Sequence, residues 1–256
     1  MRRPLLLLLF CSLAATAAPK RVLYITHSAG FQHASLPTSC AVMRDLGVRS
    51  GEFEVTCSED LSLISAESLQ GFDILYFFTS GELALSDQQK ADMLAFVRDG
   101  KGFGGAHSAT DTLYTWPEYG ELIGAWFNGH PWTQEVSIRV EDPDHPVTQS
   151  LPPSFRFADE IYQFRDFSRD RVHVLLSLDT SSVDLSAPGV AREDGDFPLA
   201  WCRDYGKGRV FYTALGHPDE TWLDERFQTL LLNALRWLSG AALAGNGGRE
   251  LVRPLF

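Results

Sequence analysis

The sequence predicts an α/β fold with a doubly wound, mainly parallel sheet, and three observations support it. Two short apolar runs, residues 21–26 and 72–78, lack the polar alternation of half-exposed strands, so each is expected to be covered on both faces. Segments with helical periodicity lie between the predicted strands, and this alternation is typical of parallel sheets. The chain of 256 residues also suits one such domain, because single domains of about 200–250 residues are ordinary.

The elements are expected in regular alternation along the chain. The strand at 21–26 ends in a polar turn, and a helix begins at Leu36. Ser86 and Gln89 form a capping box for a helix over 87–99, which Gly100 ends. Residues 142–146 form a turn between later elements. Further strands are expected at 52–57, 72–78, 135–140, 172–178 and 199–203, in the residues just before His107, and in the segment that begins at Val210. Further helices are expected at 36–46, 116–128 and 224–238.

Residues 1–18 have the features of a secretory signal peptide. Arg2 and Arg3 precede an apolar run that begins at Leu5, and the segment ends in small residues. This run is shorter than the about 20 apolar residues of a membrane span, and no other stretch approaches that length. The mature protein is therefore expected to be exported, to a periplasm or outside the cell, and to have no membrane association after cleavage.

The charge balance argues against several classes of partner. The chain has 22 Lys and Arg against 33 Asp and Glu, and its formal net charge of -11 becomes -13 when Arg2 and Arg3 are removed. Such an acidic protein does not suit a nucleic-acid backbone or an anionic membrane surface. The sequence contains no dinucleotide or phosphate-loop fingerprint, so no nucleotide cofactor is expected.

Three cysteines remain in the mature chain: Cys40, Cys57 and Cys202. At most one disulfide can form among them, and the absence of CxxC spacing gives no indication of a metal-thiolate cluster. They are interpreted mainly as small core residues.

Histidines follow three of the expected strands. His27, His107 and His217 each come directly after a strand, at its carboxyl end. In doubly wound sheets, ligands bind beyond this edge. Imidazoles delivered to one edge by three separate strands therefore indicate a functional site.

The segment Gly104-Gly-Ala-His107-Ser-Ala109 has the form of a strand-to-helix elbow with a histidine at its exposed tip. Together with His217-Pro-Asp-Glu220, it resembles the class I glutamine amidotransferase-like fold, a flavodoxin-like sheet in which an elbow cysteine pairs with a His-Pro-Glu element. His107 replaces that cysteine here, and an imidazole suits metal ligation or proton transfer better than acyl transfer. The chain is therefore not expected to be a glutamine amidotransferase.

Five motifs follow one another along the chain. They are His27-Ser-Ala-Gly-Phe-Gln-His33, Gly104-Gly-Ala-His107-Ser-Ala109, Gly124-Ala-Trp-Phe-Asn-Gly-His130-Pro, Asp159-Glu-Ile-Tyr162 and Tyr205-Gly-Lys-Gly-Arg-Val-Phe-Tyr-Thr-Ala-Leu-Gly-His217. In this order they resemble the trehalose-utilisation, or ThuA-like, family. The resemblance implies one ThuA-like domain over residues 20–240 and a role in carbohydrate catabolism, on disaccharides or their 3-keto derivatives. Residues 241–256 are expected to be a flexible C-terminal tail.

His27, His33, His107 and His130 are the candidate metal ligands. His27 and His33 are six residues apart in a loop that can fold back on itself. With His107 or His130 they could supply the nitrogen ligands that zinc or a related divalent metal prefers. The alternative is an ordinary polar sugar pocket without a metal.

The candidate catalytic residues are His107, His217 and Glu160. Glu160 could act as a general acid or base, or as a metal carboxylate ligand, whereas Asp159 is interpreted as part of a solvated loop. The candidate substrate-binding residues are aromatic: Phe31, Trp132 and Tyr162.

Two hypotheses about function follow from these residues. The first is an exported carbohydrate-processing enzyme, a hydrolase or lyase that acts on a disaccharide or a 3-keto-glycoside. A metal or the histidine cluster would polarise a sugar carbonyl or activate water, while Glu160 or His217 moves a proton. The second is a non-catalytic carbohydrate-binding protein with the same pocket. Both hypotheses imply a small carbohydrate as partner, and neither predicts the oligomeric state.

Overall fold

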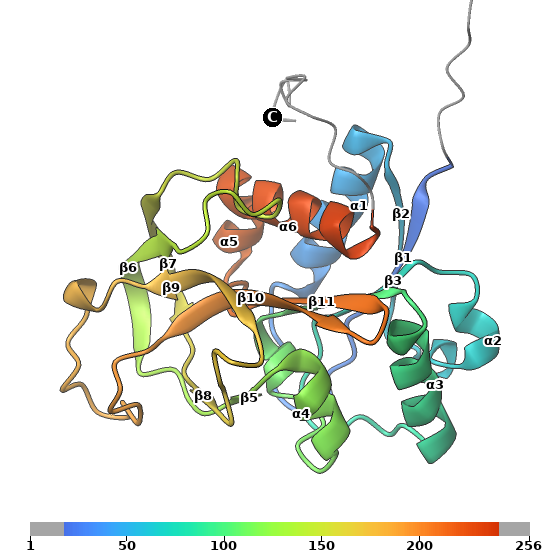
Figure 1. The fold of residues 1–256 in the computed structure, drawn as a ribbon, viewed down its shortest axis with the longest axis horizontal. Coiled ribbons are helices and arrows are strands. Elements are labelled where there is room, and N and C mark those ends of the chain that lie inside the picture. Colours follow the sequence, from blue (N-terminus) through green and yellow to red (C-terminus); the bar gives the residue numbers. More distant parts are fainter. Residues whose placement is uncertain (1–17, 241–256) are drawn as a thin grey trace, which may run out of the picture.

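The computed structural model describes residues 18–240 (Figure 1). The predicted C-terminal tail and all but the last residue of the predicted signal peptide lie outside the described residues. Among the helices of the described part, none is both long and apolar enough to cross a membrane.

A large mixed sheet forms the centre of the molecule. Its strands are β1 (Lys20–Ile25), β2 (Phe53–Ser58), β3 (Ile74–Phe77), β4 (Gly102–Ala106), β6 (Trp132–Val140), β7 (Ser154–Ile161), β9 (His173–Leu178), β10 (Pro198–Tyr205) and β11 (Gly208–Thr213). The nine strands lie in the order β2-β1-β3-β4-β11-β10-β9-β6-β7. The first five are parallel, and from β11 to β7 each strand is antiparallel to its neighbour. A separate small pair consists of β5 (Trp126–Phe127) and β8 (Phe164–Arg165).

Helices cover both faces of the parallel half of the sheet. They are α1 (Leu36–Ser50), α2 (Ala66–Leu69), α3 (Asp87–Arg98), α4 (Pro117–Ile123), α5 (Asp219–Leu223) and α6 (Glu225–Leu238). Helices α1, α5 and α6 pack together on one face, while α3 and α4 lie on the other (Figure 1). Short 3-10 helices occur at Leu61–Leu63, His107–Thr110 and Thr180–Ser182. The predicted α/β, doubly wound and mainly parallel architecture is confirmed for this half.

The local sequence explains the central elements. Val22–Ile25 and Ile74–Phe77 are fully buried, as expected for apolar strands covered by helices on both faces. Helix α3 begins with the predicted capping box, in which Ser86 accepts from the Gln89 backbone and the Gln89 side chain accepts from the Ser86 backbone.

Three expectations about local structure were wrong. The helix expected over 116–128 ends at Ile123, because Gly124 adopts a left-handed conformation with φ 103° and β5 follows. The residues around Asp159 belong to the end of β7 and not to a solvated loop. Cys40 and Cys57 form a disulfide that joins α1 to β2, whereas Cys202 is free and buried, as expected of a small core residue.

The antiparallel half bends back over the edge of the parallel half. Strand β7 lies four positions from β11, a separation of about 19 Å in a flat sheet with about 4.8 Å between strands. Nevertheless, the Asp159 Oδ2 atom at the end of β7 lies 2.8 Å from the Gly216 nitrogen just after β11. The register of β9 against β10 shifts near Ala200, as irregularities at bends do. The end of β7 therefore reaches the carboxyl edge of the parallel strands.

Candidate functional site

Three histidines meet at the carboxyl edge of the parallel strands. His33 precedes α1, His107 follows β4 and His217 follows β11. One ring nitrogen from each lies within 4.8 Å of the others, and their ring centroids are 4.8 to 5.3 Å apart. His33 and His107 are buried, while His217 is partly exposed. The sheet thus brings together imidazoles that are far apart in the sequence.

His107 occupies a strained and fixed position. Its φ of 46° lies in the left-handed region, which costs a non-glycine residue about 1–3 kcal/mol and is often retained at functional sites. The side chain is fully buried, so the elbow tip is not exposed as the sequence suggested. Its Nδ1 donates to the Ala214 carbonyl over 2.7 Å, which directs its Nε2 toward the cluster. The Tyr162 hydroxyl lies 2.9 Å from that Nε2.

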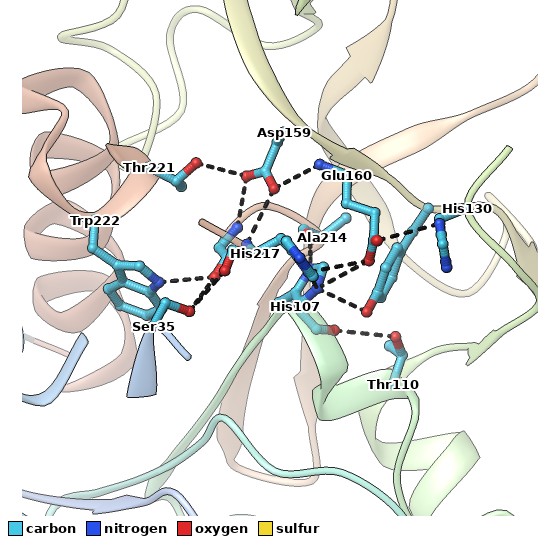
Figure 2. Close-up of polar contacts among 12 residues, drawn as sticks. Ser35, His107, Thr110, His130, Asp159, Glu160, Ala214, His217, Thr221 and Trp222 are labelled. Carbon is cyan, nitrogen blue, oxygen red and sulfur yellow. Dashed lines mark hydrogen bonds and ion pairs between the residues drawn. The ribbon is translucent and has the colours of Figure 1, made fainter. Parts of the chain in front are cut away.

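Glu160 contacts His107, His130 and His217 (Figure 2). Its Oε2 lies 3.3 Å from His217 Nδ1 and 3.5 Å from His107 Nε2, and its Oε1 lies 3.2 Å from His130 Nδ1. Burial acts to raise the pKa of Glu160, but the hydrogen bonds and charges of His107 and His217 outweigh it and hold the pKa well below its usual range. Glu160 is therefore a carboxylate at neutral pH and could ligate a cation.

The pKa values of His33 and His217 are shifted in opposite directions. Burial, with the neighbouring His107 and His217, lowers the pKa of His33 to about 3. The hydrogen bond that His217 donates to the Glu160 carboxylate raises the pKa of His217. Burial raises the pKa of the Tyr162 phenol far above its usual range, so this group stays protonated and can donate a hydrogen bond. His33 is consequently neutral at every physiological pH and could offer a ring nitrogen to a metal ion.

A cavity of about 520 Å³ adjoins His33 on the side of α1 and β2. Its lining includes the polar residues Thr26, Gln32, Arg44, Ser58 and Glu59. This volume is within the range of about 300–1,000 Å³ that small-molecule sites occupy.

Not all of the predicted site residues join the cluster. In the described part of the chain, His27 has no contact with the three histidines, and its Nδ1 donates to the Glu59 carbonyl. His130 reaches Glu160 from a half-exposed position. Trp132 is buried, packs against Phe197 and donates its indole N–H to the Asp184 carbonyl, so its ring offers no free face.

The two other aromatic candidates do lie at the cluster. Phe31 is 63% exposed and stacks on His217, with ring centroids 6.4 Å apart. Tyr162 is buried, with its ring 4.3 Å from that of His107.

Sequence reasoning missed Asp159. This residue is 3% exposed and accepts hydrogen bonds from the backbone N–H groups of Gly216 and His217 (Figure 2). The available signal was the alternation of Phe155, Phe157 and Ile161, which has the period of a strand and places Asp159 on the same face.

Comparisons with known proteins agree with this fold. The trehalose utilisation (ThuA) family profile matches residues 21–238. A ThuA-like protein from Bacteroides uniformis is 26% identical, with a TM-score of 0.70 over 87% of this chain and 93% of that one. One from Parabacteroides merdae is 20% identical, with a TM-score of 0.70 over 88% and 92%. A β-galactosidase from Bacillus circulans shares the fold alone, at 12% identity and a TM-score of 0.55 over 90% of this chain and 32% of that one. Comparison with curated proteins finds no match. The chain belongs to the ThuA, or trehalose utilisation, family.

Proposed function

We propose that this protein is an exported carbohydrate-processing enzyme, a hydrolase or lyase that acts on a disaccharide or a 3-keto-glycoside with the help of a divalent metal. One observation carries the proposal: His33, His107 and His217 converge from three separate segments of the chain, with Glu160 beside His107 and His217. Clusters of this kind, with perturbed proton affinities, are typical of functional sites.

The donor set fits a divalent metal such as zinc. Ligands about 2.0–2.1 Å from a tetrahedral zinc ion are about 3.3–3.4 Å from one another. His107 Nε2 and His217 Nδ1 are 3.2 Å apart, and Glu160 Oε2 lies 3.5 Å and 3.3 Å from them. The Ala214 carbonyl fixes the tautomer of His107, as partners of metal-binding histidines commonly do. His33, His107 and His217 would hold the ion, and Glu160 is the additional donor.

A bound divalent cation supplies Lewis acidity, which polarises a carbonyl and acidifies water. Glu160, as a carboxylate, accepts the proton removed from water or from the C–H beside a 3-keto group. Its contact with half-exposed His130 gives that proton a route to solvent. The Tyr162 phenol stays protonated and donates a hydrogen bond within the site.

The surroundings of the cluster support a carbohydrate as substrate. The exposed ring of Phe31 next to His217 offers an apolar face to a sugar ring. The cavity beside His33 carries hydroxyl, amide, guanidinium and carboxylate groups that can bind sugar hydroxyls. The chain's net charge of -11 favours a neutral ligand over an anionic one.

Export is supported by two independent features. The signal-like segment at 1–18 is one, and the disulfide between Cys40 and Cys57 is the other. Disulfides persist in oxidising compartments and are rare in the cytosol.

The test measures metal content and turnover on the same preparation. Protein purified without a His-tag is analysed for bound metal and then incubated with 3-keto-glycosides and unoxidised disaccharides across a panel of divalent metals. We expect one metal ion per chain and substrate loss that depends on it. His107→Ala and His217→Ala are expected to lose both, while His173→Ala, which removes an exposed histidine paired with Asp142, is the matched control.

Wild-type protein that holds no metal under any loading condition, and leaves both substrate classes unchanged, would overturn the proposal. A control variant that loses as much metal as His107→Ala would also count against it, because the effect would then not belong to this cluster.

Carbohydrate binding without turnover is the second candidate function. The exposed Phe31 ring suits it equally well, because stacking needs no catalytic group. Calorimetry distinguishes the two: stable binding of a sugar that is recovered unaltered supports a binding protein.

A further inference from the structure

The Asp159 carboxylate is buried and fully hydrogen-bonded. Its Oδ1 accepts from the backbone N–H groups of Glu160 and His217, over 2.7 Å and 3.1 Å. Its Oδ2 accepts from the Gly216 N–H over 2.8 Å and the Thr221 hydroxyl over 2.9 Å. Four donors therefore surround one carboxylate that does not itself face the histidine cluster.

These bonds fix the turn that carries His217. Asp159 holds the N–H groups of Gly216 and His217, while Ser35 donates to both of their carbonyls and the Trp222 indole donates to that of Gly216 (Figure 2). Gly216 has a φ of 135°, which a larger residue rarely adopts. The backbone N–H and C=O groups of Gly216 and His217 are thus all hydrogen-bonded.

Asp159 also joins two parts of the site. It lies on β7 directly before Glu160, and successive side chains of a strand point to opposite faces. Glu160 thus reaches the His217 imidazole, while Asp159 reaches the His217 backbone. The strand and the turn are consequently locked in one register, in which Glu160 Oε2 is 3.3 Å from His217 Nδ1.

We propose that Asp159 is a positioning residue for a divalent cation site, because it fixes His217 relative to Glu160. This inference rests on the proposed function, because it assigns a role toward the metal that the histidine cluster would hold. Asp159 acts through His217 and does not contact the ion.

Asp159→Asn tests the inference, because an amide keeps the shape but presents two N–H donors where an acceptor is needed. Zn²⁺ and Co²⁺ affinities are measured by titration calorimetry, and the visible absorption of bound Co²⁺ reports the geometry of its ligands. We expect affinity to fall about 10–100-fold and the Co²⁺ spectrum to change. Asp224→Asn, which alters the N-cap of α6, is the matched control and should retain wild-type values.

Circular dichroism establishes that each variant is folded. If Asp159→Asn does not fold, Thr221→Val replaces it, since this change removes one of the four donors and keeps the side-chain volume. A smaller loss of affinity in the same direction is then expected.

Each outcome decides one question. Wild-type protein that binds neither ion overturns the metal site itself, and the inference with it. Wild-type protein that binds both, together with a folded Asp159→Asn of equal affinity and an unchanged Co²⁺ spectrum, overturns the role of Asp159 alone. A folded Thr221→Val variant with unchanged affinity and an unchanged Co²⁺ spectrum would likewise overturn the role of Asp159 alone.

Discussion

Acid should destabilise the fold, because a proton binds to His33 in the unfolded chain but not in the folded one. Burial lowers the pKa of His33 to about 3 in the folded protein, against about 6.5 in an unfolded chain. Because the folded pKa is the lower one, the neutral state contributes stability above pH 6.5, and this is lost as the pH falls toward 3.

The magnitude follows from the two pKa values. Between pH 7.5 and pH 5.0 the unfolded chain takes up nearly one proton at this position and the folded chain almost none. The free energy of unfolding should fall by about 2 kcal/mol from this group alone, since one pH unit is worth about 1.4 kcal/mol. His33→Gln keeps a polar side chain but does not titrate, so it should lose about 2 kcal/mol less over the same interval.

Urea denaturation in the presence of a chelator, at several pH values from 5.0 to 7.5, gives the required free energies. The control is His173→Gln, which removes an exposed histidine and should follow the wild-type pH dependence. Equal losses for wild type and His33→Gln would refute the reasoning, because His33 would then bind its proton equally well in both states.

Three further substitutions test separate features. Glu160→Gln should lower the pKa of His217, because the carboxylate is the main cause of its elevation; NMR titration of metal-free protein checks this, and an unchanged pKa would contradict it. Gly104→Ala should cost about 1–3 kcal/mol or more, since its Cβ would lie 2.1 Å from the buried ring of Tyr76, and an unaltered melting temperature would disprove the packing argument. Cys40→Ser opens a disulfide between residues 17 apart and should cost about 3 kcal/mol in guanidinium chloride without reductant, whereas fully reduced wild type should match the variant.

The parallel half of the fold was accessible from sequence because its signals are local. The runs at 21–26 and 72–78 are apolar on both faces, and the Ser86 capping box marks the start of α3 at its true position. The end of the helix expected over 116–128 was placed too late, although Gly124 is the same kind of stop signal as Gly100.

The site was predictable only in part. Strand ends placed His107 and His217 at one edge of the sheet, and both lie there in the structure. His27 and His33 share one loop, yet only His33 turns inward, and no periodicity distinguishes them. The contact of Asp159 with the turn after β11 depends on the curvature of the antiparallel half, which brings two distant segments together. The sequence of neither segment indicates this contact.

The bend of the sheet that brings β7 to His217 has a consequence for how the protein matures. His107 is 110 residues from His217 and 55 from Tyr162, so the cluster closes several long loops at once. Contacts of such separation form late, because chain entropy must be lost before they contribute. A chain truncated before β11 would carry His33, His107 and Glu160 but have no turn to complete the cluster. The histidine cluster is thus complete only after the whole domain has been synthesised and has folded.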